Sequence, residues 1–145
     1  MAERRTINTE VLLDEVRAHL AEGKRVRLRV KGKSMHPFIL EDDMLVLAPA
    51  ESLRKGDIVL ARINKSRYVV HRIIGITNGI ITLMGDGNLY GREECRREDI
   101  FGIALSVIHN GEVTELLSVS SRLIASVWRS LLPFRRIIWK IKKYI

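Results

Sequence analysis

The feature that most constrains this chain is a series of short strand-like segments, separated by turn signals, between Arg25 and Ile108. Gly, Asn, Asp and Pro mark the breaks, and Asn78-Gly79 between two apolar runs is the strongest hairpin signal. Many short strands without intervening helices predict a mainly β fold, a compact and largely antiparallel domain. The expected strands cover residues 26–30, 44–47, 57–63, 68–76, 79–84 and 101–108.

A helix is expected on each side of this β segment. Apolar residues recur at helical spacing from Val11 to Leu20, and Gly23 ends the pattern, which predicts a helix over roughly residues 9–22. Residues 118–145 have the pattern of a basic amphipathic helix, which Pro133 should kink or divide. The expected units are an N-terminal helix (1–24), a β domain (25–116) and a C-terminal helix (117–145).

The positive charge of the chain is concentrated at its C-terminal end. The net charge is +8, and residues 118–145 contain seven of the 25 Lys and Arg residues with no Asp or Glu, so the rest is nearly neutral. The uncharged runs are too short to span a bilayer, but two tryptophans among these cations favour peripheral contact with an anionic membrane surface. Packing on the domain, a partner protein and nucleic acid are the alternatives. No secretory signal precedes the first helix, so we expect a cytoplasmic or peripheral membrane protein.

Several classes of site lack the residues that they need. A single cysteine, Cys95, excludes an internal disulfide and a cysteine-based zinc site. The four histidines are far apart and have no metal-ligand spacing, so neither a metal nor another cofactor is expected. Because one helix stands alone before the strands, a helix-turn-helix and sequence-specific nucleic-acid binding are not expected.

A serine follows the first expected strand at a rigid corner of the chain. The strand stops near Gly32, which can adopt backbone angles that other residues avoid, and Ser34 comes two positions later. Pro37 fixes the chain on the far side of the turn. Such a corner suits a nucleophile, with backbone N–H groups free to face a ligand. The alternative is an ordinary polar turn residue.

Two further residues have the chemistry that a serine nucleophile requires. A serine hydroxyl needs a base within hydrogen-bond reach, and His71 interrupts an apolar strand. Asp86 follows another strand between two glycines and could accept a hydrogen bond from the second ring nitrogen of His71. The alternatives are a histidine satisfied within the core and an aspartate that forms a turn.

Five segments, in this order, resemble the sequence boxes of type I signal peptidases, whose superfamily includes the self-cleaving LexA-like repressors. The resemblance covers about residues 25–108 and rests on Gly32-Lys33-Ser34-Met35-His36-Pro37, Lys55-Gly56-Asp57-Ile58-Val59, Val70-His71-Arg72-Ile73-Ile74-Gly75, Gly85-Asp86-Gly87-Asn88 and Ile100-Phe101-Gly102-Ile103-Ala104. It implies a signal-peptidase/LexA-like β fold.

The resemblance also implies roles for individual residues. Ser34 would be the acylating nucleophile. His71 stands where most bacterial members have a lysine base, so with Asp86 the site looks like the Ser-His-Asp version of the endoplasmic-reticulum and archaeal branch. Gly32 replaces a serine that binds the oxyanion in some members, so backbone N–H groups would do so here, including that of Ser34. Met35 and Pro37 would complete the segment facing the substrate and oxyanion.

The implied function is that of a serine endopeptidase with a Ser-His dyad or Ser-His-Asp triad. It would cleave an extended peptide or leader, with small side chains near the cut, docked beside the active-site strand. The N-terminal transmembrane anchor that signal peptidases normally carry is not expected here. One alternative is a non-catalytic module that binds peptides or a membrane surface. Another is LexA-like self-cleavage, which the absence of an Ala-Gly or Cys-Gly bond disfavours.

Overall fold

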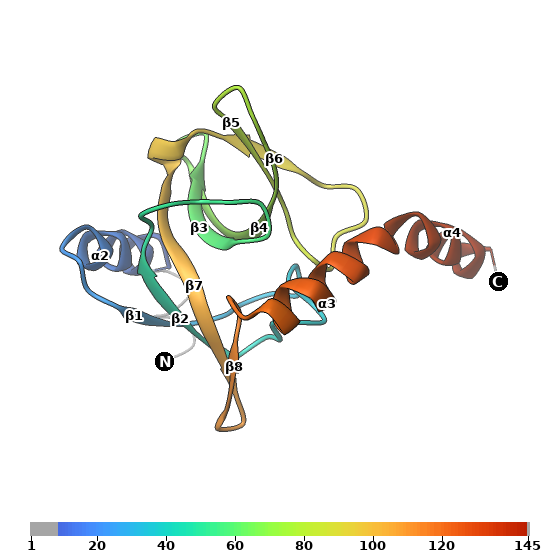
Figure 1. Ribbon diagram of the computed structural model, residues 1–145, viewed down its shortest axis with the longest axis horizontal. Coiled ribbons are helices and arrows are strands. Elements are labelled where there is room, and N and C mark those ends of the chain that lie inside the picture. The colour runs from blue at the N-terminus through green and yellow to red at the C-terminus, as the bar shows by residue number, and fades with distance from the viewer. Residues whose placement is uncertain (1–8, 145) are drawn as a thin grey trace.

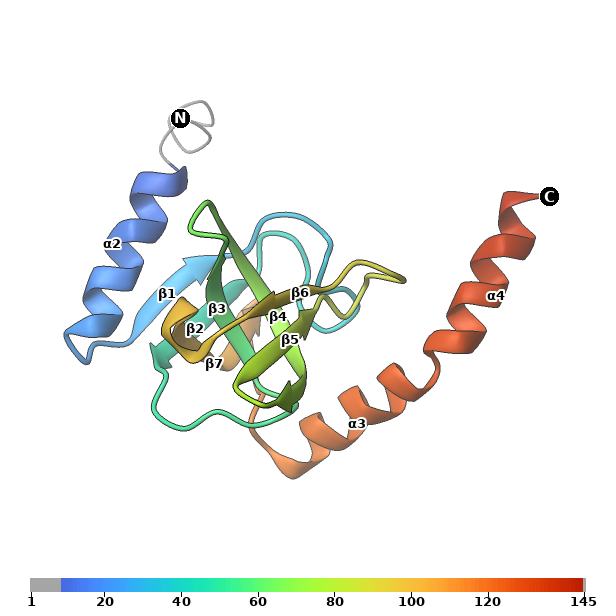
Figure 2. The ribbon, with the colours of Figure 1, turned by 90° about the horizontal axis from the view of Figure 1, so that it is seen from above.

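The strand segments of the sequence pair into one strongly curled antiparallel sheet. The structure is a computed structural model and describes residues 9–144 (Figures 1 and 2). The sheet order is β1-β2-β7-β3-β4-β5-β6, with β8 paired to β7. The strands are β1 (Val26–Arg29), β2 (Met44–Pro49), β3 (Ile58–Ile63), β4 (Arg67–Thr77), β5 (Ile80–Met84), β6 (Glu93–Cys95), β7 (Ile100–His109) and β8 (Glu112–Glu115).

The predicted fold class is confirmed, and the six predicted strands end within two residues of those observed. The hairpin prediction is also confirmed, because Thr77 pairs with Ile80 and both turn residues have positive φ, 52° at Asn78 and 78° at Gly79. Two positive φ values define the type I′ turn that suits the twist of paired strands. Strands β6 and β8 were not predicted from the sequence.

Helix α2 (Thr9–Ala21) covers one side of the sheet and joins the larger of two apolar clusters. Val16 and Leu20 of α2 pack with Leu45 and Leu60 from the sheet. Leu20 lies directly on β7, since a Cβ at Gly102 would come within 2.8 Å of its Cδ1. Each such fully buried aliphatic side chain contributes about 1.5–3 kcal/mol to stability.

The other face of β3, β4 and β5 forms the second apolar cluster, which includes Val59, Ile73 and Leu83. Strand β3 therefore contributes to both clusters, with Ile58 and Leu60 on one face and Val59 and Ala61 on the other. All residues of β3 except Arg62 are therefore buried, and the strand is covered on both faces of the sheet.

Two helices, α3 (Val119–Ser130) and α4 (Leu132–Lys143), form a bent arm that extends from the sheet (Figure 2). The expected C-terminal helix is thus divided at Leu131. Pro133 lies in the first turn of α4, where its missing N–H has no helical partner to lose. A short 3₁₀ helix, η1 (Arg97–Asp99), precedes β7.

Polar contacts from both helices fasten this arm to the β domain. Arg122 of α3 bonds the buried carboxylate of Asp57 at 2.5 Å. The Trp128 indole donates to the backbone oxygen of Asp86 at 2.8 Å, and Arg136 of α4 donates to that of Leu89 at 2.7 Å. Within residues 9–144 no helix has the length and apolar character needed to cross a bilayer.

Candidate active site

Ser34 lies on the loop between β1 and β2, whose ends are joined by backbone hydrogen bonds. The N–H of Val30 donates to the oxygen of Asp43 at 2.9 Å, and the N–H of Asp42 donates to that of Val30 at 2.8 Å. Gly32 has a φ of +83° and donates its N–H to the Glu41 carboxylate at 3.0 Å. Glycine is therefore suited to this position, because other residues avoid such a φ.

Met35 and Ile39 anchor the loop in the apolar core, with exposed fractions of 2% and 0%. Ser34 between these anchors and the strand end remains partly exposed, and Pro37 is exposed. Of the predicted substrate-facing residues, Met35 thus lies beneath the loop, whereas Gly32 and Pro37 lie on its surface.

His71 is brought to Ser34 by β4. Its Nε2 lies 3.2 Å from Ser34 Oγ, within hydrogen-bond distance, although 37 positions separate the two residues. The imidazole is buried, with 8% of the side chain exposed, so its position is fixed by surrounding atoms. The structure therefore brings the predicted nucleophile and the predicted base together.

A carboxylate that was not predicted occupies the other side of the imidazole. Glu93 Oε1 lies 2.6 Å from His71 Nδ1, and only 9% of the Glu93 side chain is exposed. Its second oxygen lies 3.6 Å from the guanidinium of Arg67, which is largely exposed. A carboxylate at Nδ1 fixes the tautomer in which Nε2 can accept a proton from a hydroxyl.

Asp86, which sequence reasoning placed beside His71, binds Arg72 instead. The carboxylate oxygens accept from Arg72 Nε and Nη2, each at 2.7 Å, and both side chains are almost fully buried. The reason is strand geometry: His71 and Arg72 are adjacent in β4, so their side chains point to opposite faces of the sheet. The segment that carries Asp86 lies on the Arg72 face.

The segment Gly85-Asp86-Gly87 nevertheless contacts the Ser34 loop through its backbone. The N–H of Gly87 donates to the oxygen of Ser34 at 2.9 Å. A Cβ at Gly85 would come within 2.4 Å of that same oxygen, and one at Gly87 within 2.9 Å of the oxygen of Lys33. The two glycines thus allow a close approach that holds the Ser34 backbone in place.

Glu93 has only a weak signal in the sequence. It belongs to the three-residue strand β6, which pairs with β5 through Leu83↔Glu93 and Ile81↔Cys95. Glu93 and Cys95 share one face of this strand, and Cys95 is buried, so an inward carboxylate follows from the alternation of side chains. That inference requires the strand to be recognised first.

Ser34, His71 and Glu93 together form a chain of hydrogen-bonding groups from hydroxyl to imidazole to carboxylate. Such a chain can move a proton from the hydroxyl to Nε2 while the carboxylate stabilises the resulting imidazolium. Among the described residues no group of three or more His, Cys, Asp and Glu side chains is arranged to hold a metal ion.

The sequence model of the family described as Peptidase S24-like matches residues 5–107. The matched span contains Ser34, His71 and Glu93 and ends within β7, so α3 and α4 lie outside it. No curated protein matches the chain. The family match supports the LexA/signal-peptidase-like superfamily and, at the level of the family, a function of the serine-peptidase type. With a match over more than two thirds of its length, the chain belongs to the Peptidase S24-like family.

Proposed function

We propose that this protein is a serine endopeptidase in which Ser34 is the nucleophile, His71 the general base and Glu93 the residue that orients His71. The observation that carries the proposal is the position of His71, 3.2 Å from the Ser34 hydroxyl and 2.6 Å from a buried carboxylate. This is the relationship of groups by which a serine is activated in hydrolases on unrelated folds. Asp86 has no part in it.

The reaction follows from these positions. Ser34 Oγ forms a bond to the scissile carbonyl carbon while its proton passes to His71 Nε2. His71 then returns the proton to the leaving amine as the C–N bond breaks, which leaves an acyl-enzyme. Water, deprotonated by the same imidazole, attacks the ester and releases Ser34.

The backbone of the Ser34 loop supplies a donor for the oxyanion. In the described part of the chain the N–H of Ser34 has no hydrogen-bond partner, whereas its carbonyl is held by Gly87. The fixed carbonyl sets the orientation of the loop, and a preorganised N–H near the nucleophile stabilises a developing negative charge.

The edge of the sheet at β1 supports an extended peptide or leader as the substrate. Among the described strands β1 pairs with β2 on one side, which leaves its other edge unpaired, and it leads directly into the Ser34 loop. A peptide that adds to such an edge presents its backbone to the end of the strand. Small residues near the cut are those implied by the resemblance to signal peptidases.

A fluorophosphonate probe tests whether Ser34 is an activated nucleophile. We expect the probe to label the wild-type protein at Ser34, as located by peptide mass analysis, and to leave Ser34→Ala unlabelled. The variant His71→Ala should label much more slowly, because no base then accepts the hydroxyl proton. An unlabelled wild-type protein would instead favour a non-catalytic module that keeps the family fold.

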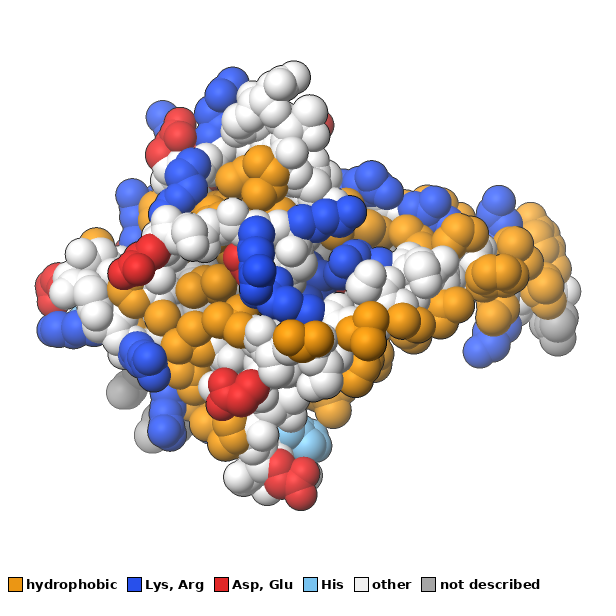
Figure 3. Space-filling model, in the orientation of Figure 1, with side chains coloured by type: hydrophobic (Ala, Val, Ile, Leu, Met, Phe, Trp, Pro, Cys, Tyr) orange, Lys and Arg blue, Asp and Glu red, His pale blue; other side chains and the backbone are white. Residues whose placement is uncertain are grey.

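We also propose that the α3–α4 arm lies on an anionic membrane surface. Apolar side chains are exposed along both helices, and Figure 3 shows them gathered on the arm with Lys and Arg alongside. Examples are Leu123 (63% exposed), Phe134 (63%) and Ile137 (54%). The cations of α4 are complementary to anionic headgroups, and the apolar side chains to the region just beneath them.

Sedimentation with lipid vesicles tests this membrane contact. We expect binding to vesicles of phosphatidylcholine with phosphatidylglycerol, weaker binding to phosphatidylcholine alone, and a several-fold loss in Ile137→Glu. A matched control is Ile76→Glu, since Ile76 is also exposed (44%) but belongs to β4 and not to the arm. Equal losses in the two variants would contradict a specific role of the arm.

A further inference from the structure

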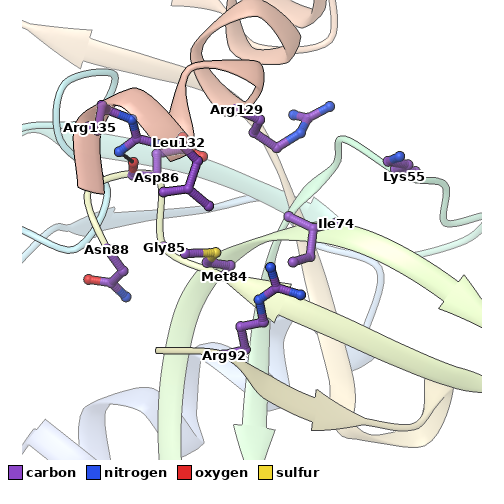
Figure 4. A pocket seen from close by; sticks show the side chains of 10 residues that line it. All are labelled: Lys55, Ile74, Met84, Gly85, Asp86, Asn88, Arg92, Arg129, Leu132 and Arg135. Atoms are coloured by element: carbon purple, nitrogen blue, oxygen red, sulfur yellow. Dashed lines mark hydrogen bonds between the residues drawn. The ribbon is translucent and has the colours of Figure 1, made fainter. Parts of the chain in front are cut away.

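A cavity of about 250 Å³ lies where the bend between α3 and α4 meets the Gly85–Asp86 segment (Figure 4). It is distinct from the Ser34–His71 pair, because its lining includes neither residue. Its walls come from both helices of the arm and from the loops that precede β3 and β6.

Four cations from four different parts of the chain line this cavity. Lys55 comes from the loop before β3, Arg92 from the loop before β6, Arg129 from α3 and Arg135 from α4, and Figure 4 shows them around Ile74 and Leu132. Among the described residues, Asp86 is the only carboxylate in the lining, and both of its oxygens are already bonded to Arg72. The positive charge of the cavity is therefore not balanced by its own walls.

Two of the guanidinium groups have buried nitrogens without an acceptor. Arg129 Nη1 and Arg135 Nε are both inaccessible to solvent and lack a hydrogen-bond partner among the described residues. Burial lowers the pKa of both side chains, and the charge of Arg72 lowers that of Arg129 further, although the nearby Asp86 carboxylate offsets part of each decrease. Buried donors are normally satisfied, so these atoms point to an acceptor that the protein chain does not provide.

The start of α4 adds to this positive potential. Leu132, its first residue, lines the cavity, and Leu131 before it provides no side-chain cap. The free N–H groups of a first helical turn attract anions, and in α4 no acidic residue of that turn neutralises them, although Pro133 contributes no N–H.

We propose that this cavity binds a phosphate group. A phosphate offers several acceptor oxygens and up to two negative charges, which suit a cavity lined by three guanidinium groups and one ammonium better than a single carboxylate does. The volume exceeds that of a bare phosphate and leaves room for one ester substituent, so the source is either free phosphate or the headgroup of an anionic lipid. This inference goes beyond the proposed peptidase activity and does not depend on it.

Occupancy would also affect the Ser34 loop indirectly. Arg135 and Trp128 both donate to the backbone oxygen of Asp86, at 3.3 Å and 2.8 Å, and the next residue, Gly87, donates to Ser34. An anion held by Arg129 and Arg135 would fasten the arm to the segment that supports the nucleophile. The bound form should therefore be the more stable one.

Thermal unfolding of the full chain in inorganic phosphate tests the proposal, with chloride at equal ionic strength as the reference. We expect phosphate to raise the Tm of the wild-type protein by several degrees and to have little effect on Arg129→Gln or Arg92→Gln. Neither side chain makes a hydrogen bond within the described residues, so both variants should fold. The control Arg25→Gln removes an exposed cation outside the cavity and should keep the full response.

Vesicles containing phosphatidylglycerol then distinguish the two sources. A loss of vesicle binding in Arg129→Gln, but not in Lys142→Gln, which removes an exposed cation of the arm outside the cavity, assigns the cavity to a lipid headgroup. Unchanged vesicle binding together with a lost response to inorganic phosphate assigns it to free phosphate. The proposal is overturned if neither probe distinguishes Arg129→Gln from its control variant. Fluorophosphonate labelling of Ser34 tests the peptidase separately, so failure of the phosphate site would leave that result unchanged.

Discussion

Replacing Ser34 with alanine should lower kcat/KM for peptide cleavage by at least about 10³-fold, because no other group can form the acyl-enzyme. His71→Ala should lose a similar factor, since the hydroxyl then keeps its proton. The measurement is hydrolysis of fluorogenic peptides with small residues at the cut. The control Ser126→Ala removes an exposed hydroxyl of α3 and should have no effect.

The double variant Ser34→Ala/His71→Ala gives a sharper result than either single change. Groups that act as a unit are not additive, so the double variant should be no slower than Ser34→Ala alone. Losses that multiply would contradict a shared proton-transfer step. Cleavage that persists in purified Ser34→Ala would remove the nucleophile from the proposed mechanism.

The variant Glu93→Gln tests whether His71 is oriented by Glu93, which the structure places beside it, rather than by Asp86, which the sequence predicts for that role. An amide can stabilise the wrong imidazole tautomer and has no negative charge to stabilise the imidazolium. We therefore expect kcat to fall by about 10²–10⁴-fold with little change in KM. Arg67→Gln removes the weaker contact of Glu93, 3.6 Å long, and should have a small effect. Full activity in Glu93→Gln would exclude its positioning role.

The difference between these two carboxylates shows what the sequence can predict in this fold. Ser34 and His71 are recognisable because each stands out locally, one at a glycine corner and one within an apolar strand. The partner of His71 depends on which strand lies beside β5, and β6 has only three residues. No local periodicity identifies so short a strand, so its glutamate could not be assigned.

The sequence predicts the wrong partner for Asp86 for a related reason. Its position after a strand and between glycines predicts a fixed carboxylate near the site, and the structure has one there. Which of two adjacent side chains it meets, His71 or Arg72, is decided by the face of β4 over which the segment passes. That choice depends on tertiary packing, which periodicity along one strand does not contain.

The buried Arg72–Asp86 pair leads to the largest expected effect on stability. Asp86→Ala should lower the free energy of unfolding by about 3–5 kcal/mol, because it leaves the guanidinium buried without its counter-charge. Urea unfolding measures this as a lower midpoint with an unchanged m value. The exposed pair of Lys24 and Glu22 provides the control, and Glu22→Gln should leave the midpoint within error.

The double variant Arg72→Met/Asp86→Leu decides between a structural and a catalytic role for Asp86. Removing both charges avoids an unpaired buried ion, so much of the lost stability should return, reduced by the bond from Arg72 to the oxygen of Gly56. If Asp86 only supports the fold, the refolded double variant should also recover peptide cleavage. A stable double variant with no cleavage, in contrast, would show that the Arg72–Asp86 pair is needed for the reaction as well as for the fold.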